Sequence, residues 1–155
     1  MAGTIQIRLD ALGIELPAAA APAANYVPYT ISGPLVLTAG QLPLKDGALV
    51  AQGLLGKDVD LATGKEAAKW CAINILAQVK AALGDLDRIG RIVRITVFVA
   101  STPDFTEQHL VANGASDLLV EVLGERGKHA RAAVGVASLP LNAPVEIDAI
   151  VEIAG

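Results

Sequence analysis

Three charged side chains stand inside apolar sequence near the end of the chain. Arg131 opens the run ARAAVGV, and Glu146 and Asp148 lie within VEIDAIVEI. A guanidinium can bind a carboxylate through two parallel hydrogen bonds, and a carboxylate can hold a water molecule and take its proton. These residues indicate a site where a small carboxylic acid reacts with water. The alternative is a surface ion pair, or a charge that keeps an edge strand from aggregating.

Both runs have the alternation of β-strands, so each has two faces. His129 and Ala133 share the face of Arg131, where the small Ala133 leaves space beside the guanidinium. Glu146 and Asp148 share the polar face of the second run. Because the apolar faces belong under helices, we expect Arg131 and Glu146 on the same, helix-free side of a sheet, on antiparallel neighbouring strands. A one-residue slip in register would reverse this expectation.

The remaining periodicity predicts the elements that must position these residues. One helix is expected from Asp60 or Thr63 to about Leu83, and another from Ser101 to Leu123 with an interruption at 113–114. The other expected strands are Tyr26–Ile31, Leu35–Thr38, Ala48–Ala51 and Arg91–Ala100. This order favours an α+β fold in which a single sheet carries both helices on one face. The bare second face indicates an oligomer.

The first 24 residues read as an N-terminal extension to a single domain of residues 25–155. Residues 4–16 have helix-like apolar spacing, and residues 17–25 form an Ala/Pro connector. No basic segment followed by an apolar run is present, so we expect no secretory signal.

Composition limits the classes of function. The chain of 155 residues is 53% hydrophobic and 18% charged, with a net charge of −4, which argues against a nucleic-acid platform and suits a packed core. The apolar stretches are too short to span a bilayer. The single Cys71 reads as an inert buried thiol and is compatible with the cytoplasm. His109 and His129 lack partners at metal-ligand spacing, so we expect neither a metal nor another cofactor.

Several short motifs together resemble the RidA/YjgF family of imine/enamine deaminases, from about Tyr26 to Ile153. The matching pieces are Pro28-Tyr29, Thr38-Ala39-Gly40-Gln41-Leu42-Pro43, Arg94-Ile95-Thr96-Val97-Phe98-Val99, Asp104-Phe105, Asn113, Ala130-Arg131, Leu139-Pro140 and Val145-Glu146-Ile147-Asp148-Ala149. The resemblance implies a chorismate-mutase-like fold, a homotrimer and a ligand cleft at each subunit interface.

The resemblance also implies roles for individual residues. Arg131 matches the arginine that grips the substrate carboxylate, and Glu146 matches the carboxylate that positions the attacking water. Among the substrate-binding candidates, Tyr29 matches the tyrosine that lines the cleft, Gly40 the glycine of a Ser-Gly-Gln turn, and Asn113 the helix asparagine that reaches the ligand.

The sequence departs from the family pattern at several positions. Alanine stands at position 39, where the family has serine, and Ala133 replaces a cysteine whose part is played by its backbone carbonyl. His129 is a further candidate for the cleft, and Asp148 reads as structural. An insertion of several residues lies around Gln108–Val111.

Two function classes remain open. The first is an enzyme that hydrolyses small 2-imino or enamine acids to 2-keto acids and ammonia without a cofactor. The second is a non-catalytic protein that binds or senses small carboxylates in the same cleft. The ribonuclease activity sometimes attributed to this family finds no support, because the chain has no basic groove and no convincing pair of general acid and base histidines.

Overall fold

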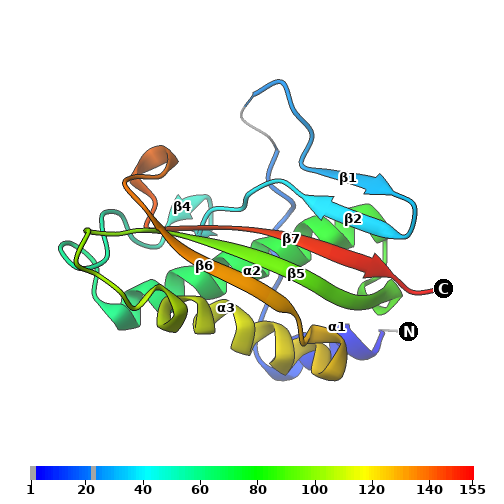
Figure 1. Ribbon diagram of the computed structural model, residues 1–155. Helices are drawn as coiled ribbons and strands as arrows, with labels where there is room; N and C mark the ends of the chain where they lie inside the picture. The colour runs from blue at the N-terminus through cyan, green and yellow to red at the C-terminus, as the bar shows by residue number, and fades with distance from the viewer. Residues whose placement is uncertain (1–2, 22–23) are drawn as a thin grey trace.

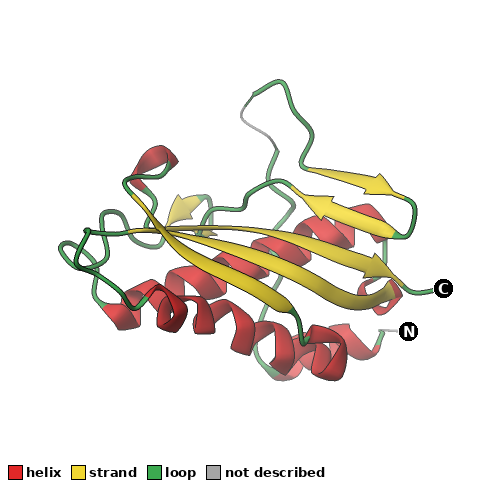
Figure 2. Cartoon of the chain, viewed as in Figure 1, coloured by secondary structure: helices red, strands yellow, loops and turns green. Residues whose placement is uncertain are grey.

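A computed structural model describes residues 3–21 and 24–155 as a twisted sheet with two long helices on one face (Figures 1 and 2). The helices are α1 (Thr4–Ala11), α2 (Leu61–Leu83) and α3 (Gln108–Leu123), with short 3-10 turns η1 (Leu86–Arg88), η2 (Gly124–Gly127) and η3 (Pro140–Asn142). The strands are β1 (Tyr29–Ser32), β2 (Leu35–Thr38), β3 (Leu44–Lys45), β4 (Ala48–Leu49), β5 (Ile89–Ala100), β6 (Ala130–Val136) and β7 (Val145–Ile153). The predicted α+β class with one main sheet is confirmed.

The main sheet has the strand order β1-β2-β7-β5-β6, and all its pairs are antiparallel except β5 with β6. The strands that carry Arg131 and Glu146 are therefore not the antiparallel neighbours we expected, because β5 lies between them. The chain leaves β5 through α3 and returns beside it, and such a helical crossover produces a parallel neighbour. The following loop then carries the chain to the opposite side of β5.

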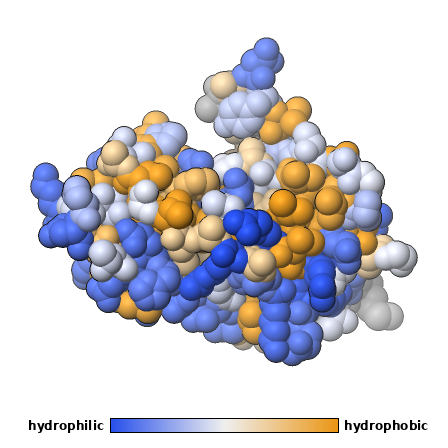
Figure 3. Space-filling model, in the orientation of Figure 1, coloured by the Kyte–Doolittle hydropathy of each residue, from blue (hydrophilic) through white to orange (hydrophobic). Residues whose placement is uncertain are grey.

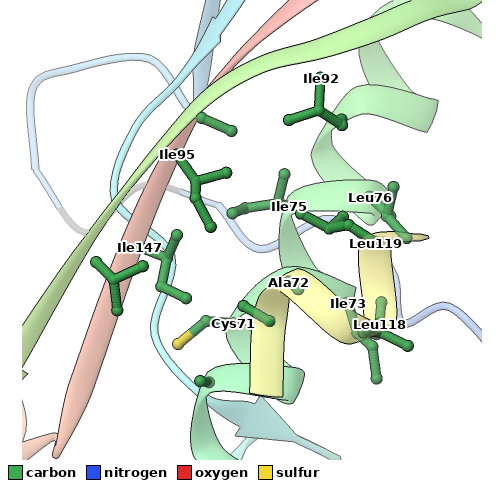
Figure 4. Close-up of a cluster of buried hydrophobic side chains, with 14 of the residues drawn as sticks. Cys71, Ala72, Ile73, Ile75, Leu76, Ile92, Ile95, Leu118, Leu119 and Ile147 are labelled. Atoms are coloured by element: carbon green, nitrogen blue, oxygen red, sulfur yellow. The ribbon is translucent and has the colours of Figure 1, made fainter. Parts of the chain in front are cut away.

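The two long helices cover the apolar face of the sheet. Alternate residues of β5 and β7 point into this core, and isoleucine, leucine, valine and alanine fill it (Figure 4). Asp60 caps α2 by accepting a hydrogen bond from the backbone N–H of Thr63 at 2.8 Å. The predicted extent of α2 is thus confirmed, with Asp60 rather than Thr63 as the cap.

Helix α3 differs from the prediction in its start and its continuity. It begins at Gln108 rather than Ser101, because the Thr102 hydroxyl donates to the Asp104 carboxylate at 2.6 Å and the segment forms a turn. It also continues through Asn113 and Gly114 without interruption. The glycine is needed for packing, since an added Cβ would collide with the Lys65 carbonyl of α2.

The N-terminal helix packs onto the same core. Ile5 and Leu9 are fully buried in it, and the backbone N–H groups of Thr4 and Ile5 donate to the carboxylate of Asp87 at 2.8 and 3.0 Å. These hydrogen bonds lower the pKa of Asp87. Helix α1 ends at Ala11, earlier than the predicted residue 16, at a turn where Gly13 has a φ of 69°.

The second face of the sheet carries no helix of the described chain. Its exposed apolar side chains include Val134 of β6, which is 44% exposed. In Figure 3, apolar side chains gather over the end of the sheet that holds β1 and β2, beside hydrophilic side chains toward the middle. Within the described residues, no helix combines the length and apolar character needed to cross a membrane.

Candidate functional site

Glu146 lies on the helix-free face of β7, beside the turn that contains Gly40. The backbones of Gln41 and Ile147 exchange hydrogen bonds of 2.7 and 3.1 Å, which hold this turn against the strand. A Cβ at Gly40 would collide with the Glu146 carboxylate. Glycine is therefore the residue that lets the main chain and the carboxylate come this close.

Buried amide side chains on α2 hold the same turn from the other side. Nδ2 of Asn74 donates to the carbonyl oxygens of Leu42 and Leu44 at 3.4 and 2.9 Å, and Nε2 of Gln78 approaches Oε1 of Gln41 at 3.4 Å. The sequence analysis did not assign this role. The available signal was a pair of amides, four residues apart, inside an otherwise apolar helix face.

The carboxylates of Glu146 and Asp148 are both half-buried and share one face of β7. Burial is the main cause that raises the pKa of Glu146, and the negative charge of Asp148 raises it further. Burial also raises the pKa of Asp148, although hydrogen bonding to Thr96 and the charge of Arg94 oppose this. A carboxylate of this kind holds a proton more strongly than an exposed one, which suits a general base.

Arg131 lies on the opposite side of the sheet from Glu146, which corrects the expectation that they share a face. In the parallel pair Arg131 is in register with Ile95, whose side chain is fully buried on the helix side, whereas Glu146 is in register with Phe98. A charged residue can face the helix side here because β6 is the edge strand and leaves Arg131 partly exposed.

The Arg131 side chain reaches helix α3. Its Nη1 donates to Oγ of Ser116 at 2.9 Å, and its Nη2 donates to the backbone carbonyl of His109 at 3.0 Å. His129, on the same face of the chain as Arg131, has Nε2 at 2.8 Å from the same Ser116 oxygen. Asn113 lies on this face of α3, since it is four residues after His109 and three before Ser116.

Apart from Tyr29, the predicted site residues thus fall into two groups, which also include Ser116 and Asp148. The Arg131 group contains Asn113, Ser116, His129, Arg131 and Ala133, along α3 and β6. The Glu146 group contains Gly40, Glu146 and Asp148, on the bare face of the sheet. Sequence analysis missed Ser116, which could have been found only once α3 was known to lie beside β6.

Tyr29 belongs to neither group in a single chain. It lies on β1, the edge strand opposite β6, in register with Thr38 and partly packed against the core. The Thr38 hydroxyl accepts a hydrogen bond from the backbone N–H of Ala149 at 3.1 Å, which ties β2 to β7 near the Glu146 group.

Other candidates for chemistry lie apart from these groups. Cys71 is fully buried, its thiol lies 3.6 Å from the Val145 carbonyl, and burial raises its pKa well above the usual value. A surface cleft of about 770 Å³ between Asp58 and Phe105 includes neither Arg131 nor Glu146. Across residues 3–21 and 24–155, no three His, Cys, Asp or Glu side chains are grouped to hold a metal ion.

Comparisons with known proteins show similarity to one family and to several of its relatives. The family described as "YjgF/chorismate_mutase-like, putative endoribonuclease" matches residues 6–153. The chain is 53% identical over 152 residues to Protein TCP17 of Trypanosoma cruzi, covering 97% of this chain and 95% of that protein.

Solved structures extend the comparison. A protein of unknown function from Agrobacterium tumefaciens is 61% identical, with a TM-score of 0.91 over 96% of this chain and 92% of that one. A "putative endoribonuclease" from Shewanella oneidensis is 38% identical, with a TM-score of 0.95 over 97% of this chain and 100% of that one. Escherichia coli TdcF with bound serine is 26% identical, with a TM-score of 0.64 over 88% and 94%.

Proposed function

Because the chain belongs to the YjgF/chorismate mutase-like family, we propose that it hydrolyses small 2-imino acids, or their enamine tautomers, to 2-keto acids and ammonia. The observation that carries this proposal is Glu146. Its half-buried carboxylate has a raised pKa and lies against a glycine turn, at the position where the family has its water-orienting carboxylate. Such a group can take a proton from water at the start of a hydrolysis.

The two groups of residues support a cleft shared between copies of the chain. The Arg131 group and the Glu146 group lie on opposite sides of one sheet, so a single chain cannot direct both at one small substrate. In the proposed homotrimer, the Arg131 group of one copy faces the Glu146 group of its neighbour. The helix-free face of the sheet, with its exposed apolar side chains, and the edge strand β6 are the surfaces that association would cover.

The proposed reaction needs only water and the groups already described. Arg131 binds the substrate carboxylate, and Glu146 and the backbone carbonyl of Ala133 orient a water molecule toward the imine carbon. Glu146 takes a proton as the water oxygen bonds to that carbon and the C=N π electrons move to nitrogen. The proton then passes to the nitrogen, which gives a carbinolamine. A second proton moves from its hydroxyl group, through Glu146, to the nitrogen as the C=O bond forms and the C–N bond breaks, and ammonia leaves the 2-keto acid. An imine carbon is already electrophilic, so no cofactor is required.

A second candidate is a binding protein for small carboxylates that uses the same cleft without catalysis. The observation that favours it is Ala39, which supplies no hydroxyl at the turn where the family has serine. The serine bound to Escherichia coli TdcF is a small carboxylic acid, which supports binding of such ligands by this fold.

The first experiment measures release of 2-keto acid from imines that an amino-acid oxidase generates in situ, with semicarbazide as the competing trap. Acceleration over the uncatalysed rate supports the enzyme. A protein that binds 2-keto acids in calorimetry but accelerates none of several imino acids is the binder instead.

The second experiment tests the shared cleft by co-expressing Arg131→Ala with Glu146→Gln under separate tags. If each site takes its arginine and its glutamate from different copies, one site in each doubly purified mixed trimer has both residues, so these trimers regain up to about one third of wild-type activity. If both residues came from one copy, mixing would restore nothing. The oligomeric state is measured by light scattering, and a monomer at micromolar concentration contradicts the proposal.

A further inference from the structure

A chain of hydrogen bonds runs from the main chain at Gly127 to the Arg131 guanidinium. Nδ1 of His129 lies 2.6 Å from the Gly127 carbonyl oxygen, and Nε2 of His129 lies 2.8 Å from Oγ of Ser116. Nη1 of Arg131 donates to the same Oγ at 2.9 Å. The guanidinium is thus attached through two side chains to a fixed point of the backbone.

The direction of each hydrogen bond follows from simple chemistry. A carbonyl oxygen can only accept, so Nδ1 of His129 must carry the hydrogen that it donates to Gly127. In the neutral imidazole, Nε2 is then an acceptor, and the Ser116 hydroxyl donates to it. This leaves the lone pairs of Oγ for the arginine. With this one histidine tautomer, every group in the series from Gly127 to Arg131 therefore has a hydrogen-bond partner of the right kind.

Both ends of this arrangement are held by the fold. Gly127 is buried at the end of η2, so close to the Leu119 carbonyl of α3 that a Cβ would not fit. Nη2 of Arg131 donates to the carbonyl of His109, two helical turns before Ser116 on α3. The guanidinium is therefore fixed at two points along one helix face.

We propose that Ser116 and His129 are positioning residues for Arg131, an inference that rests on the proposed function. They hold the guanidinium in one orientation before a ligand arrives, so that binding need not order a long side chain at a sheet edge. An arginine has five N–H donors, and the hydrogen bonds to Ser116 and His109 use two of them. Three donors remain for a substrate carboxylate.

The test compares the effect of substitutions at Ser116 on KM with their effect on kcat. Ser116→Ala should raise KM for the imino acid, and the Kd of the 2-keto acid measured by calorimetry, roughly 10-fold, the effect of one hydrogen bond to a charged group. The kcat should change by less than about threefold, since Ser116 touches no reacting atom. Ser116→Thr keeps the hydroxyl and should restore binding. Ser32→Ala, a matched change at an exposed serine of β1, should leave both constants at wild-type values.

A double-mutant cycle separates positioning from a general structural role. In an Arg131→Lys background, Ser116→Ala should have little further effect on KM, because its partner is already lost. Full additivity of the two changes would overturn the inference, as would an unchanged KM and Kd in a folded Ser116→Ala protein. His129→Phe removes the acceptor of the serine hydroxyl and should give a smaller rise in KM, of about threefold.

NMR of the ligand-free protein tests the positioning of Arg131 separately from the proposed function. In nitrogen-15 NMR at low temperature, hindered rotation should give separate Nη signals for Arg131, identified by their loss in Arg131→Lys. Ser116→Ala should merge them. If the wild-type protein neither hydrolyses imines nor binds keto acids, the proposed function fails even when these signals behave as expected. If the signals are already merged in the wild type, the positioning role fails.

Discussion

The Arg131 group and the Glu146 group are positioned by different physical means. Arg131 is a long side chain on an edge strand, and hydrogen bonds to Ser116 and to the His109 carbonyl determine where its charge lies. Glu146 is in the sheet interior, and its place depends on backbone pairing and on the space left by Gly40. One group is held by polar contacts and the other by main-chain geometry.

This difference suits the different tasks proposed for the two groups. A guanidinium that binds a carboxylate must present its donors in a fixed orientation, and hydrogen bonds specify orientation well. A general base must hold its proton more strongly than an exposed carboxylate does, and burial achieves that. Substitutions in the two groups should therefore impair the protein in different ways.

The largest effect is expected for Glu146→Gln. The amide cannot accept a proton from water, so kcat for imine hydrolysis should fall about 100- to 10 000-fold, the range for loss of a general base. Binding of a 2-keto acid should remain, because Arg131 is untouched. Rate assays with calorimetry on the same preparation check this, with Glu152→Gln, an exposed carboxylate on the same strand, as the control. Activity that survives would remove Glu146 from the chemistry.

Loss of the guanidinium should act on binding as well as on rate. Arg131→Ala should cost about 2–4 kcal/mol of transition-state stabilisation, or roughly 30- to 1000-fold in kcat/KM. Arg131→Lys should be nearly as poor, because an ammonium group cannot make two parallel hydrogen bonds to a carboxylate. Steady-state kinetics of both variants test this. If Arg131 is only a surface charge, stability will change by less than about 1 kcal/mol and binding not at all.

The sequence correctly predicted which side chains share a face of each strand. It did not predict on which side of the sheet the Arg131 face lies, because that depends on the neighbouring strand. Alternation placed His129, Arg131 and Ala133 on one face, and it placed Glu146 on the bare face, both as observed. The side on which Arg131 lies depends on its register with β5, which no pattern within its own strand records.

The helices give a similar lesson. The composition of α2 made its limits predictable, but the pair Asn113-Gly114 was taken for a break. The glycine is present because the backbone of α2 comes close at Lys65, a contact between residues far apart in sequence. Ser116 and Asn74 were missed for the same reason, since each has hydrogen-bond partners outside its own helix.

A smaller effect is expected for Gly40→Ala. The added methyl group would collide with the Glu146 carboxylate, so the side chain or the turn must move, with an overpacking cost of about 1–3 kcal/mol in the free energy of unfolding. The kcat should fall because the base is displaced, whereas Arg131 is left in place. Denaturant unfolding and kinetics measure the two effects. Gly155→Ala, which has open space around it, is the matched control. A fully active Gly40→Ala protein would show that Glu146 need not lie against the turn.

The smallest effect is expected for Asp148→Asn, and it appears in pH dependence. The charge of Asp148 is the second cause, after burial, of the raised pKa of Glu146. Without that charge the pKa of Glu146 should move downward but stay above the ordinary value, because the burial remains. Since the base must be deprotonated to act, the acid limb of the kcat/KM profile should shift to lower pH. Glu152→Gln, on the same face of β7, should leave the limb in place.

The stability of the Asp148→Asn variant tests independently whether folding raises the pKa of Asp148. The folded-state pKa of Asp148 is raised, so its contribution to stability is fully present below the unfolded pKa and is lost as pH rises through the folded pKa. Asp148→Asn removes this loss, so its Tm should exceed that of the wild type at neutral pH and converge with it at about pH 3, below the ordinary aspartate pKa. A lower Tm at neutral pH would mean that the Arg94 and Thr96 contacts outweigh burial. Asp148 would then be a structural anchor of the Glu146 group rather than a charge that tunes its base.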